Sequence, residues 1–126
     1  MSVKHILLAE SDASLAHIMA LLLKQAGFRV STAKDGRETL HLLTTIEAKG
    51  EAVDLVITGL HRLTAEVDQR FLHEMTAREP AVPVIAITTT DDDALIHRLN
   101  DLGCAACITK PFEAETLMNS IRAVLR

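Results

Sequence analysis

The chain has 126 residues, of which 48% are hydrophobic, enough for one compact domain with its own core and too few for two. The net charge of -4 and the lack of a basic cluster exclude a general nucleic-acid or membrane-surface binder, because both need a concentrated basic face. We therefore expect a single domain over residues 1–126. The short apolar run after His5 is too brief for a signal peptide, and no run approaches a membrane span, so we expect a cytoplasmic protein.

The amino-terminal quarter of the chain predicts a strand followed by a helix. The apolar run His5–Ala9 is typical of a buried strand. The next apolar residues recur at helical spacing, which places them on one face of a helix that ends at Gly27 and that Asp12 or Ser14 can cap. These residues are Leu15, Ile18, Met19, Leu22 and Leu23.

The same alternation continues through the middle of the chain. Strand-like runs at Arg29–Ala33 and Val53–Thr58 are each followed by a helical period. The first of these helices begins near Asp35 and stops at Gly50, and the second ends at Pro80.

The carboxyl-terminal part predicts two further strand and helix pairs. Val82–Thr88 leads into a helix over Asp91–Leu102, and Ala105–Thr109 leads into a helix over Glu113–Leu125. Strict alternation with short connections implies a parallel sheet with right-handed crossovers and helices on both faces. The fold class is therefore α/β, a five-stranded doubly wound sheet in a three-layer sandwich.

Polar residues gather where the strands end. The carboxyl ends of parallel strands meet at one edge of such a sheet, and that edge lines the ligand crevice. The residues brought there are Glu10, Ser11, Gly59, Thr88 and Lys110. Gly59 offers no side chain at this edge.

This constellation resembles the CheY-like receiver domain of two-component signalling, a flavodoxin-like fold. The resemblance rests on four segments: Ile6–Asp12, Asp54–Leu60, Pro83–Thr88 and Ile108–Phe112. It implies that two acids should end the first strand, that an aspartate accepting a phosphoryl group should end the third, that a hydroxyl should end the fourth, and that a lysine should end the fifth.

By that resemblance Glu10 stands for the first acid, Thr88 keeps the hydroxyl and Lys110 keeps the cation. Ser11 replaces the second acid and Gly59 replaces the phosphoacceptor. Without a carboxylate there is no nucleophile to form an acyl phosphate. The segment 60–64 also lacks the proline and glycine usual after the acceptor.

The loss of two carboxylates predicts weak or absent Mg²⁺ binding and no other cofactor. Glu10 and Lys110 nearly cancel in charge, and a hard cation prefers several oxygen ligands. Asp12 is the other weak candidate ligand, but we expect it to cap the following helix. We expect Lys110 to pair with Glu10 or to rest on strand-end carbonyls; an anion site made with Thr88 is the alternative.

Two further features have a functional and a plain interpretation. Cys104 and Cys107 form a C-x-x-C, but residues three apart in a strand lie about 10 Å apart on opposite faces, so we expect ordinary buried thiols rather than a redox or metal pair. Cys107 also stands where the resembling family carries an aromatic switch. His61 could take a phosphoryl group, although a solvated loop histidine is the simpler interpretation.

The sequence predicts a non-enzymatic, phosphorylation-independent protein-interaction module whose partner is a histidine kinase, an effector domain or another regulator. The resemblance places the interaction surface on the fourth helix, fifth strand and fifth helix, a face that could also form a homodimer. Its residues are Asp93, His97, Arg98, Asn100, Cys107, Glu115, Asn119 and Arg122. One alternative is a receiver that a histidine kinase phosphorylates on an atypical residue. The other is a flavodoxin-like binder of a small ligand such as a flavin, which is disfavoured because the first loop has no run of Gly, Ser or Thr that could hold a phosphate.

Overall fold

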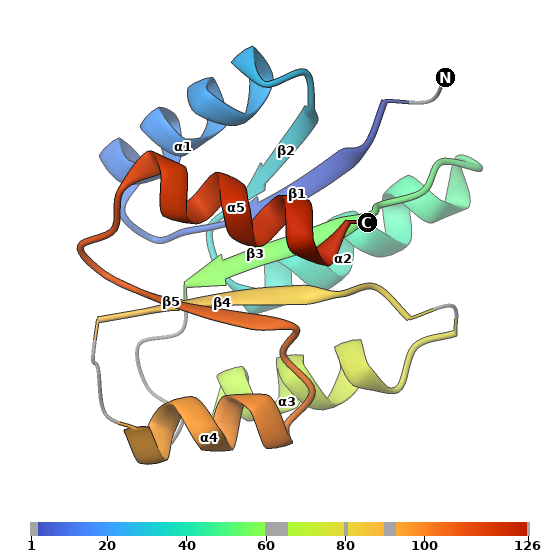
Figure 1. Cartoon of the computed structure of the whole chain (residues 1–126). Coiled ribbons are helices and arrows are strands. Elements are labelled where there is room, and N and C mark those ends of the chain that lie inside the picture. The colour runs from blue at the N-terminus through green and yellow to red at the C-terminus, as the bar shows by residue number, and fades with distance from the viewer. Residues whose placement is uncertain (1–2, 60–65, 80, 90–92, 126) are drawn as a thin grey trace.

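A parallel five-stranded sheet forms the centre of the molecule (Figure 1). The structure is a computed structural model that describes residues 3–59, 66–79, 81–89 and 93–125. The strands lie in the order β2-β1-β3-β4-β5. They are β1 His5–Ala9, β2 Arg29–Ala33, β3 Leu55–Gly59, β4 Val84–Thr88 and β5 Ala106–Thr109.

One helix follows each strand in the chain, which confirms the predicted doubly wound α/β architecture. The helices are α1 Ala13–Gln25, α2 Gly36–Ala48, α3 Glu66–Thr76, α4 Asp93–Asp101 and α5 Ala114–Val124. Asp12 caps α1 by accepting a hydrogen bond from the Leu15 N–H at 3.1 Å, and Asp35 caps α2 through the Glu38 N–H at 2.9 Å. No helix of the described residues is long and apolar enough to cross a membrane.

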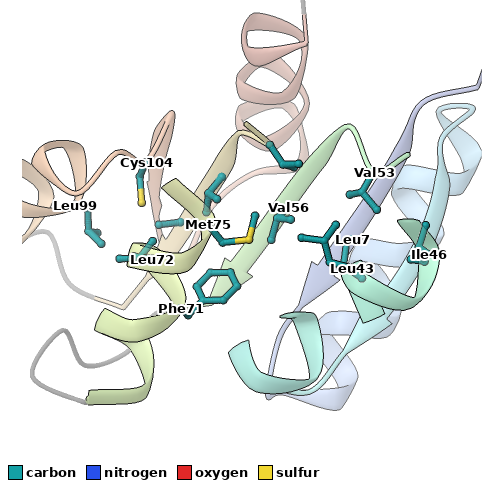
Figure 2. Close-up of a cluster of buried hydrophobic side chains, with 13 residues drawn as sticks. Leu7, Leu43, Ile46, Val53, Val56, Phe71, Leu72, Met75, Leu99 and Cys104 are labelled. Carbon is teal, nitrogen blue, oxygen red and sulfur yellow. The ribbon is translucent and has the colours of Figure 1, made fainter. Parts of the chain in front are cut away.

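Two aliphatic cores lie on opposite faces of the sheet. On one face α1 and α5 pack on alternate residues of the strands through buried side chains such as Leu23 and Leu117. On the other face α2, α3 and α4 enclose a cluster around Phe71, Met75 and Leu99 (Figure 2). The strand residues are buried from both sides, as continuous apolar runs require.

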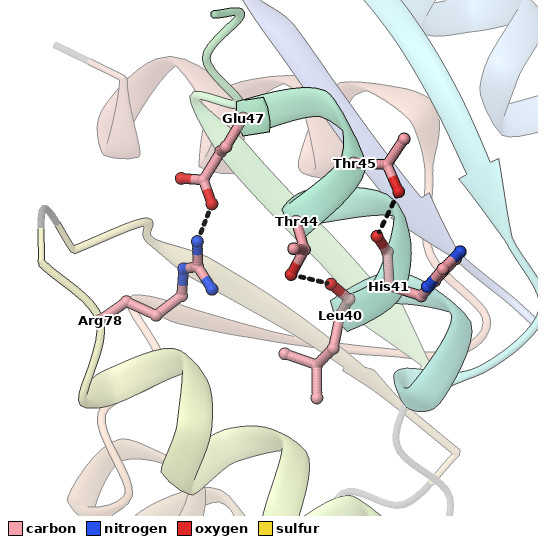
Figure 3. A network of polar contacts seen from close by, with 6 residues as sticks. All are labelled: Leu40, His41, Thr44, Thr45, Glu47 and Arg78. Atoms are coloured by element: carbon pink, nitrogen blue, oxygen red, sulfur yellow. Dashed lines mark hydrogen bonds and ion pairs between the residues drawn. The ribbon is translucent and has the colours of Figure 1, made fainter. Parts of the chain in front are cut away.

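Polar contacts reinforce the second layer beside α2 (Figure 3). Glu47 of α2 forms an ion pair with Arg78, which follows α3. The hydroxyls of Thr44 and Thr45 donate back to helix carbonyls one turn earlier, at 3.0 and 2.9 Å, so these exposed or half-buried threonines satisfy their polar groups within α2.

The structure corrects the predicted face of α1. Ile18 is 55% exposed, and the buried face consists of Met19, Ala20 and Leu23. The apolar arc of this helix is wider than the surface that the sheet covers, so its outer edge, including the half-buried Leu15, reaches solvent. A small residue, Ala20, faces the core where α1 approaches the sheet.

The amino end of the sheet holds a buried histidine among charged groups. His5 is 3% exposed, and its Nε2 lies 2.8 Å from the Ser31 hydroxyl. Its backbone N–H donates to the Asp54 carboxylate at 2.8 Å, while Arg29 pairs with Glu51 at 3.1 Å nearby. Burial, with a smaller contribution from Arg29, lowers the pKa of His5 below the ordinary value of 6.5.

The depressed pKa of His5 predicts acid-dependent loss of stability. The unfolded chain takes up a proton at a higher pH than the folded chain, so this stabilisation is complete above pH 6.5 and is lost as the pH falls toward the folded-state pKa. Urea unfolding at about pH 7.5 and about pH 5.5 measures it. His5→Gln should reduce the drop, whereas His41→Gln, at an exposed position, should leave it unchanged. Equal drops in both variants would contradict this origin.

Candidate functional site at the carboxyl edge of the sheet

The strand register brings the predicted site residues to one edge. Gly59, the last residue of β3, pairs with Ile87 of β4, and Thr88 of β4 pairs with Thr109 of β5. Glu10 directly follows β1 and Lys110 directly follows β5. The carboxyl edge therefore presents a carboxylate, a glycine, a threonine and an ammonium group in strand order.

The central contact at this edge is an ion pair between Glu10 and Lys110. Lys110 Nζ lies 2.6 Å from Glu10 Oε1, and the two side chains are 19% and 1% exposed. Strands β3 and β4 lie between β1 and β5, which puts β1 and β5 about 14 Å apart at ~4.8 Å per strand. The two long side chains of Glu10 and Lys110 therefore meet across the ends of β3 and β4.

The residues after Glu10 do not add a second free carboxylate to the ion pair. The Asp12 carboxylate caps α1, and the Asp12 backbone N–H donates to Glu10 Oε2 at 3.0 Å. Ser11 is exposed and lines a cleft beside α1. Glu10 is thus held by the chain on one oxygen and by Lys110 on the other.

Thr88 supports the far side of the edge from within the core. Its side chain is fully buried, and its carbonyl accepts the Lys110 N–H at 2.7 Å, which ties the end of β4 to the start of the loop after β5. The Lys110–Pro111 peptide bond is cis.

The described residues at this edge offer a poor donor set for Mg²⁺. Among them, Glu10 carries the carboxylate that is not used as a helix cap, and Lys110 already balances its charge. Within the part of the chain that the structure describes, no three His, Cys, Asp or Glu side chains are grouped so that they could hold a metal ion. No chemical step through a metal follows from this geometry.

The predicted interaction residues lie along α4, β5 and α5. Both helices contact β5. The exposed members are His97, Arg98, Asn100, Glu115, Asn119 and Arg122. Cys107 is half-buried, and the Asp93 side chain lies outside the described residues, as does the whole of His61 and the segment 60–64.

The two cysteines lie on one face rather than on opposite faces. Cys104 precedes β5, so strand alternation does not govern its direction, and it is buried in the same cluster against which Cys107 packs. Both are free thiols. Burial, helped by Cys107, raises the pKa of Cys104 to about 12, and burial also raises the pKa of Cys107.

These raised pKa values predict unreactive thiols in the native protein. At neutral pH the thiolate fraction of Cys104 is so small that its alkylation should be about a thousandfold slower than that of a free cysteine. The measurement is iodoacetamide labelling read by mass spectrometry, before and after unfolding, with Cys107→Ser to isolate the Cys104 signal. Rapid labelling of folded Cys104, or a recovered Cys104–Cys107 disulfide, would contradict the prediction.

Sequence reasoning missed an apolar groove beside the site. A groove of about 570 Å³ runs between α1 and the loop after β5, lined by residues that include Leu15, Ile18 and Phe112. Ile18 and Leu21 are also large exposed hydrophobic residues of α1. Two apolar residues at the margin of the helical arc were the signal that could have pointed to it.

Comparison with known proteins assigns the chain to a family. The model of the response regulator receiver domain matches residues 6–122, so the chain belongs to that family. Among solved structures, the chemotaxis response regulator CheY4 of Vibrio cholerae superposes with a TM-score of 0.81 at 23% identity, covering 98% of this chain and 100% of that chain. The receiver domain of HemR from Leptospira biflexa gives a TM-score of 0.81 at 27% identity, covering 97% and 94%.

Curated relatives are longer proteins. The sensory transduction protein RegX3 of Mycobacterium tuberculosis is 31% identical over 121 residues, which are 96% of this chain and 50% of that protein. The transcriptional regulatory protein GlrR of Escherichia coli is 30% identical over 117 residues, 93% of this chain and 25% of that protein. The chain thus spans half the length of RegX3 and a quarter of the length of GlrR.

Proposed function

We propose that this receiver domain acts in two-component signalling as a protein-interaction module that works without being phosphorylated. The single observation that carries the proposal is Gly59, which ends β3, the strand end to which the family resemblance assigns the phosphoacceptor aspartate. Glycine has no side chain to attack a phosphoryl donor, and no change of environment can supply one.

The Glu10–Lys110 pair supports the same conclusion. The Lys110 ammonium lies 2.6 Å from the carboxylate of Glu10, whose side chain is buried. Releasing Lys110 would leave that carboxylate uncompensated inside the protein, a change that costs several kcal/mol. This cost favours an arrangement in which Lys110 stays paired with Glu10.

The surface formed by α4, β5 and α5 is the proposed binding face, for a kinase, an effector domain, another regulator or a second copy. It carries exposed groups of both signs, including Arg98 and Glu115. Charges of this kind at an interface govern partner choice and association rate more than affinity.

The binding face can be tested by charge reversal. Arg98→Glu combined with Arg122→Glu should abolish capture of the partner. The two substitutions replace two positive charges on the binding face with negative ones, which would repel the groups that the arginines attract. The measurement is a pull-down from the source cell, with the partner identified by mass spectrometry and its binding repeated with purified proteins. Arg37→Glu, exposed on α2, is the matched control. Unchanged capture by the double variant, or capture that requires acetyl phosphate, would contradict the proposal.

The retained Thr88 and Lys110 favour one second candidate, a receiver phosphorylated on an atypical residue. Both stand at the strand ends where the family resemblance places a hydroxyl and a lysine. Radiolabel incorporation from acetyl phosphate into the native chain, mapped to a residue by mass spectrometry, would favour this candidate over the interaction module.

A further inference from the structure

A second cleft opens at the outer edge of the sheet, on the side of α1 away from the apolar groove. It has a volume of about 490 Å³, within the usual range for small-molecule sites. Its walls come from α1, from the ends of β1 and β2, and from the first turn of α2. The carboxyl edge of a doubly wound sheet is the usual location of ligands in such folds.

Small side chains make room for this cleft. Ala13, Ala16 and Ala20 line it from α1, and Ala33 lines it from the end of β2. Positions 13, 16 and 20 lie on one face of the helix, so the alanines form a continuous shallow floor. Larger residues at these positions would fill the space.

Basic side chains surround the alanine floor. His17 and Lys24 line the cleft from α1, two turns apart on one helix face, and Lys34 lines it from the segment after β2. Within the described ranges, neither Lys24 nor Lys34 has a carboxylate within ion-pair distance. Both ammonium groups are exposed at the cleft and are not neutralised by the fold.

The acids in the cleft do not cancel this charge. Lys110 balances Glu10, which leaves Glu38 as the acid lining the cleft whose charge is not paired in the described structure. Two lysines against one glutamate give a positive cleft on a chain whose net charge is -4. The hydroxyls of Ser11 and Thr32 line the same space and can donate hydrogen bonds to an anion.

We propose that this cleft binds a small organic anion whose phosphate or carboxylate group lies between Lys24 and Lys34 and whose apolar body rests on the alanine floor. The inference does not rest on the proposed function, since it uses neither Gly59 nor the α4–β5–α5 face. The same cleft touches Glu10 and Ser11, so an occupant would contact the chain directly beside the Glu10–Lys110 ion pair at the carboxyl edge of the sheet.

The test is an amide NMR titration with three probes: adenosine monophosphate for a phosphate, benzoate for a carboxylate, and adenosine as the uncharged counterpart. One of the two anions should shift the Ala16, Ala20 and Thr32 amides saturably, while adenosine should not. Lys24→Gln and Lys34→Gln should each weaken binding about tenfold, which corresponds to ~1.4 kcal/mol. Glu38→Gln should strengthen binding, because it removes the repulsive charge.

Lys49→Gln, at an exposed lysine that does not line the cleft, is the matched control and should bind like the native protein. All four substitutions are at exposed or half-buried positions, so folding can be verified from the same spectra. No saturable shift with either anion, equal binding of adenosine, or no change in the lysine variants would overturn the proposal.

Discussion

Replacing Lys110 with methionine should lower the free energy of unfolding by about 3 kcal/mol. The substitution keeps the length of the side chain but removes the ammonium that lies 2.6 Å from Glu10 Oε1. The Glu10 side chain is 1% exposed, so water cannot take the place of the lost cation. One hydrogen bond from the Asp12 N–H remains, which keeps the cost at the lower end of the range for breaking a buried ion pair.

The double substitution Glu10→Gln with Lys110→Met should recover much of that loss, because it leaves no buried charge. Lys24→Met is the matched control: that lysine is exposed and should change stability by less than about 0.5 kcal/mol. Urea unfolding at neutral pH gives all three values. A Lys110→Met protein as stable as the native one would show that the ion pair does not hold the edge together.

Adding two acids should convert the edge into a metal site. Ser11→Asp combined with Gly59→Asp adds two carboxylates next to Glu10, and their charge exceeds what Lys110 can balance. The double variant should bind Mg²⁺ saturably, while the native protein should show no saturable binding. A carboxylate at position 59 would also supply a nucleophile, so acetyl phosphate should transfer its phosphoryl group to that oxygen with release of acetate.

The control for added charge is Thr44→Asp combined with Thr116→Asp, at exposed positions on α2 and α5. It changes the net charge equally without placing acids at the edge. Isothermal titration with Mg²⁺ and phosphoprotein gel analysis are the measurements. Equal Mg²⁺ binding by the native protein and the double variant would mean that the number of carboxylates does not limit metal binding at this edge.

The alternation of strands and helices was readable from the sequence because the pattern of apolar residues sets it locally. The bounds of β1 and β2 agree with the prediction, while β3 begins at Leu55 rather than Val53. The difference arises where Asp54 meets His5. The Asp54 N–H donates to the His5 carbonyl at 2.8 Å, but the His5 N–H donates to the Asp54 carboxylate rather than to a backbone carbonyl.

The sequence predicted which residues lie at the carboxyl edge better than it predicted the contacts that they make. Strand ends identify Glu10, Gly59, Thr88 and Lys110, and the expected Glu10–Lys110 pair is present. The direction of Cys104 and the exposure of Ile18 were not predictable in this way, because each depends on how closely a neighbouring element packs. The alanine-floored cleft lay outside sequence reasoning for the same reason.

The measurement that tests the central claim most directly is an amide NMR titration of the native protein with Mg²⁺, followed by beryllium fluoride and acetyl phosphate. The signals to follow are those of Gly59, Thr88 and Lys110. If the carboxyl edge binds neither Mg²⁺ nor a phosphoryl group, as we propose, none of the three amides should show a saturable shift and mass spectrometry should find no phosphoprotein. Saturable shifts that spread from the edge into α4 would show a working phosphorylation switch and would contradict the interaction-module account.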